Sequence, residues 1–107
     1  MLKKLLRVKE ALLQVPAEVF HYDAFKKSDQ YIIWAETGEG TSFHADNRKQ
    51  EQVIVGTIDY FTKTDLDPNL DAIQEALKSA EISFFLESVQ YEEETKYIHY
   101  EWKFEVS

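Results

Sequence analysis

The end of the chain, residues 95–106, alternates between large apolar and mostly polar side chains with a period of two. Successive side chains of a β-strand point to opposite faces, so this alternation is typical of a strand that is buried on one side. The apolar set is Ile98, Tyr100, Trp102, Phe104 and Val106, and the other set is Tyr97, His99, Glu101, Lys103 and Glu105. One face of this strand is therefore predicted to pack in the core and the other to be exposed to solvent.

Four earlier segments are rich in β-branched and aromatic residues and are also predicted strands. They are residues 19–22, residues 31–35 with an end at 37–38, residues 53–62 and residues 82–91. In the last of them Phe84, Phe85 and Leu86 are adjacent, which fits a bulge or burial on both sides. The acidic tip at residues 92–94 joins it to the final strand as a hairpin connection.

Two segments carry apolar residues at helical spacing. The first, residues 2–14, has leucine at positions 2, 5, 6, 12 and 13 and stops near Pro16. The second follows Asp67, a natural N-cap, and Pro68, which suits the first helical position. We expect it to run for about 13 residues and to end near residue 80. Its apolar stripe is Leu70, Ile73, Leu77 and Ala80.

The predicted order is helix, strand, strand, strand, helix, strand, strand. Since strands and helices do not alternate regularly, as they would around a parallel sheet, the order predicts an α+β fold. The expected architecture is a single mixed, mainly antiparallel sheet of about five strands, covered by the two amphipathic helices. With 107 residues, 44% of them hydrophobic, the chain is long enough for one domain only. A long exposed loop is expected at about residues 38–52.

The charge of the chain is unevenly distributed. It has 12 basic and 20 acidic side chains, a net charge of −8, without a concentrated basic patch, so nucleic acid is not an expected partner. The first 15 residues carry +3, whereas residues 16–107 carry 8 basic and 19 acidic side chains, a net charge of −11. This pattern fits a core-packing helix with a solvated basic face. Alternatively, the basic helix of one copy meets an acidic surface of the next, a head-to-tail contact that can close into a ring.

Several classes of protein are excluded by what the sequence lacks. The chain has no cysteine, which excludes disulfides, thiolate metal sites and cysteine nucleophiles. Arg7, Lys9 and Glu10 interrupt what would be the apolar part of a signal peptide. No apolar stretch approaches the roughly 20 residues of a membrane helix. We therefore expect a soluble, unprocessed chain with no membrane partner.

No motif points to catalysis. Of the three histidines, His21, His44 and His99, only His44 has a potential metal ligand at a suitable local spacing, Asp46. No serine lies in a nucleophile-elbow context, and the glycines at 38 and 40 lack the helix, lysine and hydroxyl of a phosphate-binding loop. We expect no enzymatic activity, no metal and no cofactor.

The candidate interaction residues lie in the loop and in the first helix. Phe43 is an aromatic residue within a polar segment, which is typical of an anchor for a protein contact. The loop candidates are Phe43, His44, Asp46, Asn47, Arg48 and Lys49, and the helix candidates are Lys3, Lys4 and Arg7.

Six segments together resemble a known family. They are PAEVFHY at residues 16–22, YIIWAE at 31–36, ADN at 45–47, GTIDYFTK at 56–63, the helix at 70–77, and YEEETKYIHYEWKF at 91–104. In their order and spacing they resemble the small tail-terminator or tail-completion (minor tail) proteins of long-tailed bacteriophages and their prophage relatives. The resemblance spans nearly the whole chain.

The resemblance implies a non-enzymatic virion protein with a mixed sheet and helices. It implies a homo-oligomeric ring, commonly hexameric in the family, at the head-proximal end of the tail. The implied partners are tail-tube and head-completion proteins, and the implied location is the virion tail, assembled in the cytoplasm of the bacterial host. A head–tail joining subunit of the same set of proteins is equally compatible with the sequence.

Two other classes of function stay open from the sequence. One is a small ligand-binding or enzymatic α+β domain with an aromatic-lined pocket that includes Trp34, Tyr60 and Trp102. The other is an inhibitor or regulator whose acidic surface imitates nucleic acid.

Overall fold

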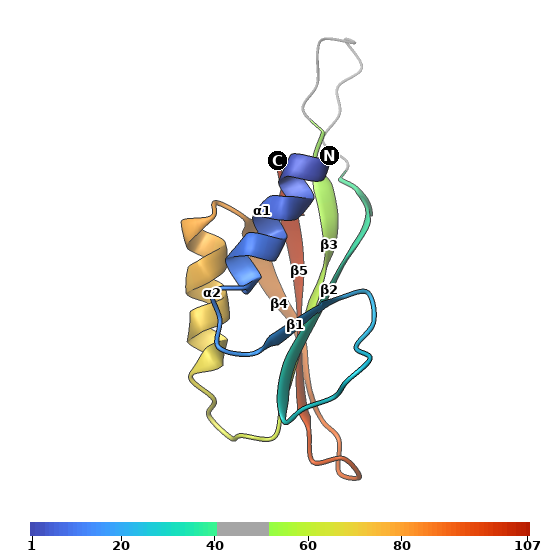
Figure 1. Ribbon diagram of the computed structural model, residues 1–107, viewed down its shortest axis with the longest axis vertical. Coiled ribbons are helices and arrows are strands. Elements are labelled where there is room, and N and C mark those ends of the chain that lie inside the picture. The colour runs from blue at the N-terminus through green and yellow to red at the C-terminus, as the bar shows by residue number, and fades with distance from the viewer. Residues whose placement is uncertain (41–51) are drawn as a thin grey trace.

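The computed structural model describes residues 1–40 and 52–107 (Figure 1). Within them, two helices and five strands follow one another in the predicted order. The elements are α1 (Leu2–Leu12), β1 (Glu18–His21), β2 (Gln30–Glu39), β3 (Ile54–Thr62), α2 (Asn69–Ser79), β4 (Ser83–Tyr91) and β5 (Ile98–Val106). The prediction of an α+β fold is confirmed.

The five strands form one mixed sheet in the order β1-β2-β3-β5-β4. Strand β1 runs parallel to β2, and the other three pairs are antiparallel. In the register of the three central strands, Trp34 on β2 lies opposite Ile58 on β3, which lies opposite Trp102 on β5. Because paired residues share a face of the sheet, this row places both tryptophans on the same side.

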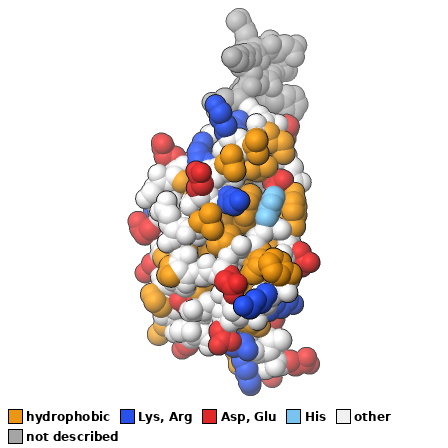
Figure 2. All heavy atoms as spheres, viewed as in Figure 1, with side chains coloured by type: hydrophobic (Ala, Val, Ile, Leu, Met, Phe, Trp, Pro, Cys, Tyr) orange, Lys and Arg blue, Asp and Glu red, His pale blue; other side chains and the backbone are white. Residues whose placement is uncertain are grey.

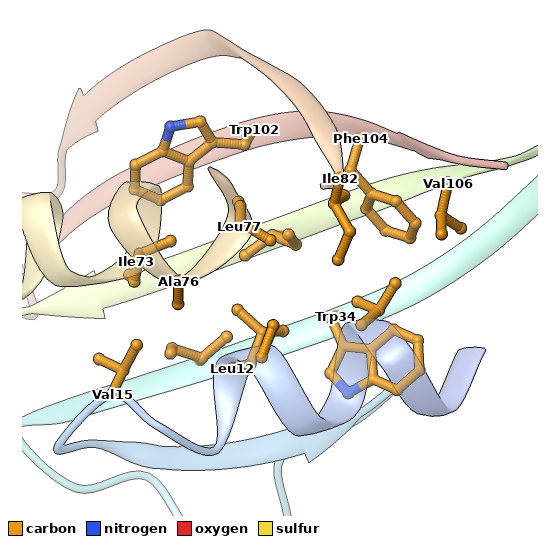
Figure 3. Packing of buried hydrophobic residues seen from close by; sticks show 14 of the residues in the cluster. Leu12, Val15, Trp34, Ile73, Ala76, Leu77, Ile82, Trp102, Phe104 and Val106 are labelled. Carbon is orange, nitrogen blue, oxygen red and sulfur yellow. The ribbon is translucent and has the colours of Figure 1, made fainter. Parts of the chain in front are cut away.

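Both helices pack on the face of the sheet that carries the tryptophans (Figures 1 and 3). The apolar face predicted for β5 is confirmed at Trp102, Phe104 and Val106, which are at most 1% exposed. The prediction for Tyr97 is wrong, because this residue, expected on the face exposed to solvent, is 8% exposed and packs in a second apolar cluster with Phe20, Ala24 and Tyr31. Figure 3 shows side chains of α1 and α2 pointing into the same core. The buried core residues of the two helices and the segment after α1 are Val8, Ala11, Leu12, Val15, Ile73, Ala76 and Leu77.

Strand β2 is longer than the sequence predicts. It shifts register between Glu36 and Gly38 and then resumes pairing with β3 as far as Glu39. The N–H of Gly40 also donates to the carbonyl oxygen of Val53, at 2.8 Å. Gly38 and Glu39, expected in the loop, therefore belong to a strand, because backbone pairing does not require apolar side chains. Residues 41–51 of the expected loop lie outside the described residues.

A bulge interrupts β4, where the pairing with β5 shifts between Leu86 and Ser88. The run of adjacent apolar residues predicted a bulge or burial on both faces. The structure has the bulge, while Phe85 and Leu86 are exposed. The strand lies at the edge of the sheet, so it has no strand on its outer side to cover them.

Helix α2 begins at Asn69, one residue after Pro68, the first helical position predicted from the sequence, and it has 11 residues instead of about 13. Pro68 has helical angles, φ −64° and ψ −16°. A carboxylate oxygen of Asp67 accepts a hydrogen bond from the backbone N–H of Asn69, at 2.8 Å. The side chain of Asp67 therefore satisfies one of the free N–H groups of the first turn, as an N-cap does.

The same carboxylate joins three elements. Its second oxygen, Oδ2, accepts hydrogen bonds from Tyr60 at 2.6 Å, from Thr62 at 2.7 Å and from Gln30 at 2.9 Å. Burial of Asp67 by itself would raise the pKa of its carboxyl, but the hydrogen bonds from Thr62, Tyr60 and the backbone outweigh burial and lower the pKa. Burial, together with the hydrogen bond to Asp67, raises the pKa of Tyr60. Asp67 is 3% exposed, so it is a buried anion held by β2, β3 and the start of α2.

Replacing this carboxylate should make the free energy of unfolding less dependent on pH in the acidic range. We expect Asp67→Asn to lower the free energy of unfolding by about 2 kcal/mol at pH 7, because a charged acceptor of several buried donors is lost. The pKa of Asp67 is lower in the folded protein than the value of about 3.9 in an unfolded chain. Its contribution is therefore fully present above pH 4 and is lost as the pH falls through the folded pKa.

Urea unfolding of both proteins at pH 7, pH 4 and pH 2.5 measures this effect. The difference between wild type and Asp67→Asn should shrink as the pH falls. A difference that stays constant over this range would contradict the role of the ionised carboxylate.

Gly56 in the middle of β3 has no room for a side chain. A Cβ atom at this position would overlap the carbonyl oxygen of Ala35 and lie 2.6 Å from the ring of Phe104. We expect Gly56→Ala to destabilise the fold by about 2–3 kcal/mol, because the buried ring cannot move away without opening the core.

The matched control is Gly38→Ala, because nothing lies within 4 Å of a Cβ atom there. This change should alter the free energy of unfolding by no more than about 0.5 kcal/mol. Thermal unfolding of both variants tests the account, and equal effects at the two positions would disprove it.

Candidate interaction surface

The candidate residues of α1 are not equivalent. Arg7 donates from Nε to the carbonyl oxygen of Ala80 at 3.2 Å, from Nη2 to that of Glu81 at 3.2 Å, and from Nη1 to that of Ser107 at 2.9 Å. These three contacts fasten α1 to the end of α2 and to the end of β5. Arg7 therefore has a role inside the subunit, and its role at an interface stays a prediction.

The two candidate lysines also differ in whether they contact the rest of the subunit. The ammonium of Lys4 donates to the backbone carbonyl of Gln52, whereas Lys3 is exposed. Lys9, which is not among the candidates from the sequence, is also exposed and lines a surface cavity. Of the basic side chains of α1, Lys3 and Lys9 are therefore presented to solvent.

The loop candidates Phe43, His44, Asp46, Asn47, Arg48 and Lys49 lie outside the described residues. Over the two described ranges, no group of three or more histidine, aspartate or glutamate side chains is placed to hold a metal. The same ranges hold no helix that is long and apolar enough to cross a membrane.

A surface cavity of about 350 Å³ lies between α1 and β1. Its lining combines side chains of α1, of β1 and of the following segment with Trp34 from β2. The lining residues are Lys9, Leu13, Val19, Phe20, His21, Asp23, Phe25 and Trp34.

The rim of this cavity has one ordered polar cluster. The ring of His21 stacks on Tyr22 with centroids 4.1 Å apart and on Trp34 with centroids 4.0 Å apart. Its Nε2 lies 2.7 Å from an oxygen of Glu36. Burial would raise the pKa of Glu36, but hydrogen bonds from Tyr22 and His21 outweigh it and lower the pKa.

The aromatic pocket expected of a ligand-binding domain has a different composition. Trp34 lines the cavity, but Tyr60 and Trp102 are 0% and 1% exposed and lie inside the packed core. The sequence placed all three in apolar strand positions and could not distinguish a lining residue from a core residue. The distinction depends on where the helices end over the sheet.

Apart from Met1 and Leu66, the exposed large apolar side chains of the described residues fall into two groups. One group lies on α1 and beside β1, where Figure 2 shows hydrophobic side chains gathered around a histidine. It consists of Leu2, Leu6, Leu13, Tyr22 and Phe25. The other group lies on the edge strand β4, where Leu86, Val89 and Tyr91 are exposed on the face that carries Trp102 and Phe85 is exposed on the opposite face. Apolar groups gathered at the surface are typical of protein interfaces.

Sequence reasoning missed most of this surface. It assigned leucines 2, 5, 6, 12 and 13 to one core-facing stripe, but Leu2, Leu6 and Leu13 are 69%, 42% and 57% exposed. The signal was present, because positions 2, 6 and 13 lie on a different face of a helix from positions 8 and 12. Phe25, which is 90% exposed, carries the same signal that selected Phe43, an aromatic residue beside a polar stretch, but was not among the candidates.

The face of the sheet away from the helices carries an aromatic ladder. Tyr31 stacks on Phe61 with centroids 4.8 Å apart, and Phe61 stacks on His99 at 4.2 Å. Nε2 of His99 lies 2.7 Å from an oxygen of Asp59. The hydrogen bond to Asp59 raises the pKa of His99. This pair ties β3 to β5 and stabilises the cationic imidazole.

Comparison with known proteins adds no relative. No family model matches the chain, and no curated protein matches it either.

The contacts of Arg7 predict a stability difference between two basic residues of α1. We expect Arg7→Ala to lower the free energy of unfolding by about 1–3 kcal/mol, because a charged donor of three backbone hydrogen bonds is lost. Lys3→Ala removes an exposed charge and should change stability by less than about 0.5 kcal/mol. Urea denaturation measures both, and equal effects would show that the Arg7 contacts do not hold α1 in place.

Proposed function

We propose that the chain is a non-enzymatic structural protein of a phage or prophage virion. In this proposal it is a ring-forming tail terminator or tail-completion subunit that acts at the head-proximal end of the tail. The observation that carries the proposal is the ordered series of segments, over nearly the whole chain, that resembles this family.

The distribution of exposed apolar residues supports the proposal. A head-to-tail ring needs two different patches on each subunit, because each copy offers one patch to one neighbour and the second patch to the other. The groups on α1 and on β4 lie on different elements and are both apolar. Two exposed basic residues of α1, Lys3 and Lys9, lie beside the α1 group, whereas the chain as a whole is acidic.

In its biological setting the proposed ring, hexameric as is common in the resembled family, meets tail-tube protein on one side and head-completion protein on the other. It needs no cofactor. A head–tail joining subunit would use the same kind of surface and differs in which of the two partners it binds first.

A second candidate function follows from the cavity between α1 and β1. Its volume of about 350 Å³ and its mixture of aromatic and charged lining residues suit a small ligand. In that case a compound that binds the cavity would quench the fluorescence of Trp34, which lines it, and raise the melting temperature. Neither effect is expected if the cavity serves a contact between proteins.

Assembly tests the virion role directly. We expect native mass spectrometry and sedimentation velocity to detect a ring of the purified chain, or a ring that forms when tail-tube protein is added. The driving force is the burial of the exposed apolar groups. A chain that stays a strict monomer at high concentration and does not bind tail tubes would contradict the proposal.

A further inference from the structure

Helix α1 has a second apolar face that its own core does not use. The buried face consists of Val8, Ala11 and Leu12, each at most 2% exposed. We call the opposite row of exposed residues the outer seam. The outer seam consists of Leu2, Leu6, Lys9 and Leu13.

The spacing along the outer seam is four, three and four residues. This is the spacing of the contact positions in a pair of packed helices, where alternate steps of three and four keep the row on one side. Leu13 follows the last helical residue but still has helical angles, φ −66° and ψ −13°. The outer seam is therefore continuous over three turns.

The outer seam is complementary to itself when two copies of α1 lie antiparallel. Leu2 of one copy then lies opposite Leu13 of the second, and Leu6 lies opposite Lys9. The aliphatic part of a lysine side chain can cover a leucine while its charge stays in water. Each of the two apolar ends thus meets an apolar end.

The charges beside the outer seam favour the same arrangement. Lys3 and Glu10 are both exposed, are seven residues apart, and lie on the same side of the outer seam. In an antiparallel pair Lys3 of each copy approaches Glu10 of the other, which makes two ion pairs. In a parallel pair, positions 3 and 10 of the two copies lie on opposite flanks of the contact, so neither ion pair forms.

We propose that two copies of this chain associate through the outer seam in an antiparallel, two-fold contact. Leu2 of each copy then lies against Leu13 of the other, at the wall of the cavity that Leu13 shares with Lys9 and Phe25. The exposed ring of Phe25 extends the apolar surface beside the helix pair. The contact uses the same patch on both subunits, so it differs from a head-to-tail contact, and it competes with any ring contact that the α1 group would make.

Disulfide trapping tests the geometry, because the chain has no cysteine of its own. A mixture of the variants Leu2→Cys and Leu13→Cys should form a covalent dimer under mild oxidation, since these positions meet only in the antiparallel pair. Each variant alone should form much less covalent dimer. A mixture of Leu66→Cys with Leu13→Cys is the matched control, because Leu66 is 87% exposed but lies in the turn before α2.

Charge reversal tests the specificity. Lys3→Glu and Glu10→Lys should each weaken self-association about tenfold, because each replaces two attractive pairs by two repulsive ones. A one-to-one mixture of the two variants should associate as wild type does, since every pair then joins opposite charges. Both changes place charges that the helix dipole favours, so neither should impair folding.

Three results would overturn the proposal. They are trapping that is no stronger in the mixture than in the control, preferential trapping of Leu2→Cys with itself, and no recovery in the charge-reversed mixture. Ring formation and binding to tail tubes are measured separately on the wild type, so the virion role can fail or stand independently of this contact.

Discussion

The buried carboxylate of Asp67 is the interaction on which the arrangement of the layers depends. A buried charge is costly unless hydrogen bonds replace its lost water, and Asp67 accepts four such bonds. These bonds fix the start of α2 relative to β2 and β3. Once α2 is fixed, its far end offers the carbonyl oxygens of Ala80 and Glu81, which hold Arg7 and thereby α1.

This sequence of contacts determines which face of α1 is left over. The inner face is committed to the core through Val8 and Leu12, and Arg7 is committed to the end of α2. The remaining side presents Leu2, Leu6 and Leu13 to solvent beside the cavity at β1. The exposure of these three leucines on one side of α1 is the basis of the proposed contact between copies.

The sequence predicted the features that depend on local pattern. The alternation along β5 gave its buried face, and Asp67 with Pro68 located the start of α2, because neighbouring residues determine both features. It did not predict that Gln30, 37 positions away, would bind Asp67, or that β1 would pair in parallel with β2. Such contacts depend on how segments distant in sequence meet, which periodicity does not encode. Within the candidate interaction surface, the charge pattern of the sequence selected Lys3 and Arg7. The apolar outer seam could be identified only after the structure had shown which face of α1 is buried.

The central claim is that the outer seam of α1 is a contact between copies. Hydroxyl-radical footprinting of the side chains over a range of protein concentration tests it most directly. The account predicts that Leu2, Leu6 and Leu13 lose reactivity together as the concentration rises, while Leu66 keeps its reactivity. Reactivity of these three leucines that does not change with concentration, or that falls only in step with Leu66, would contradict it.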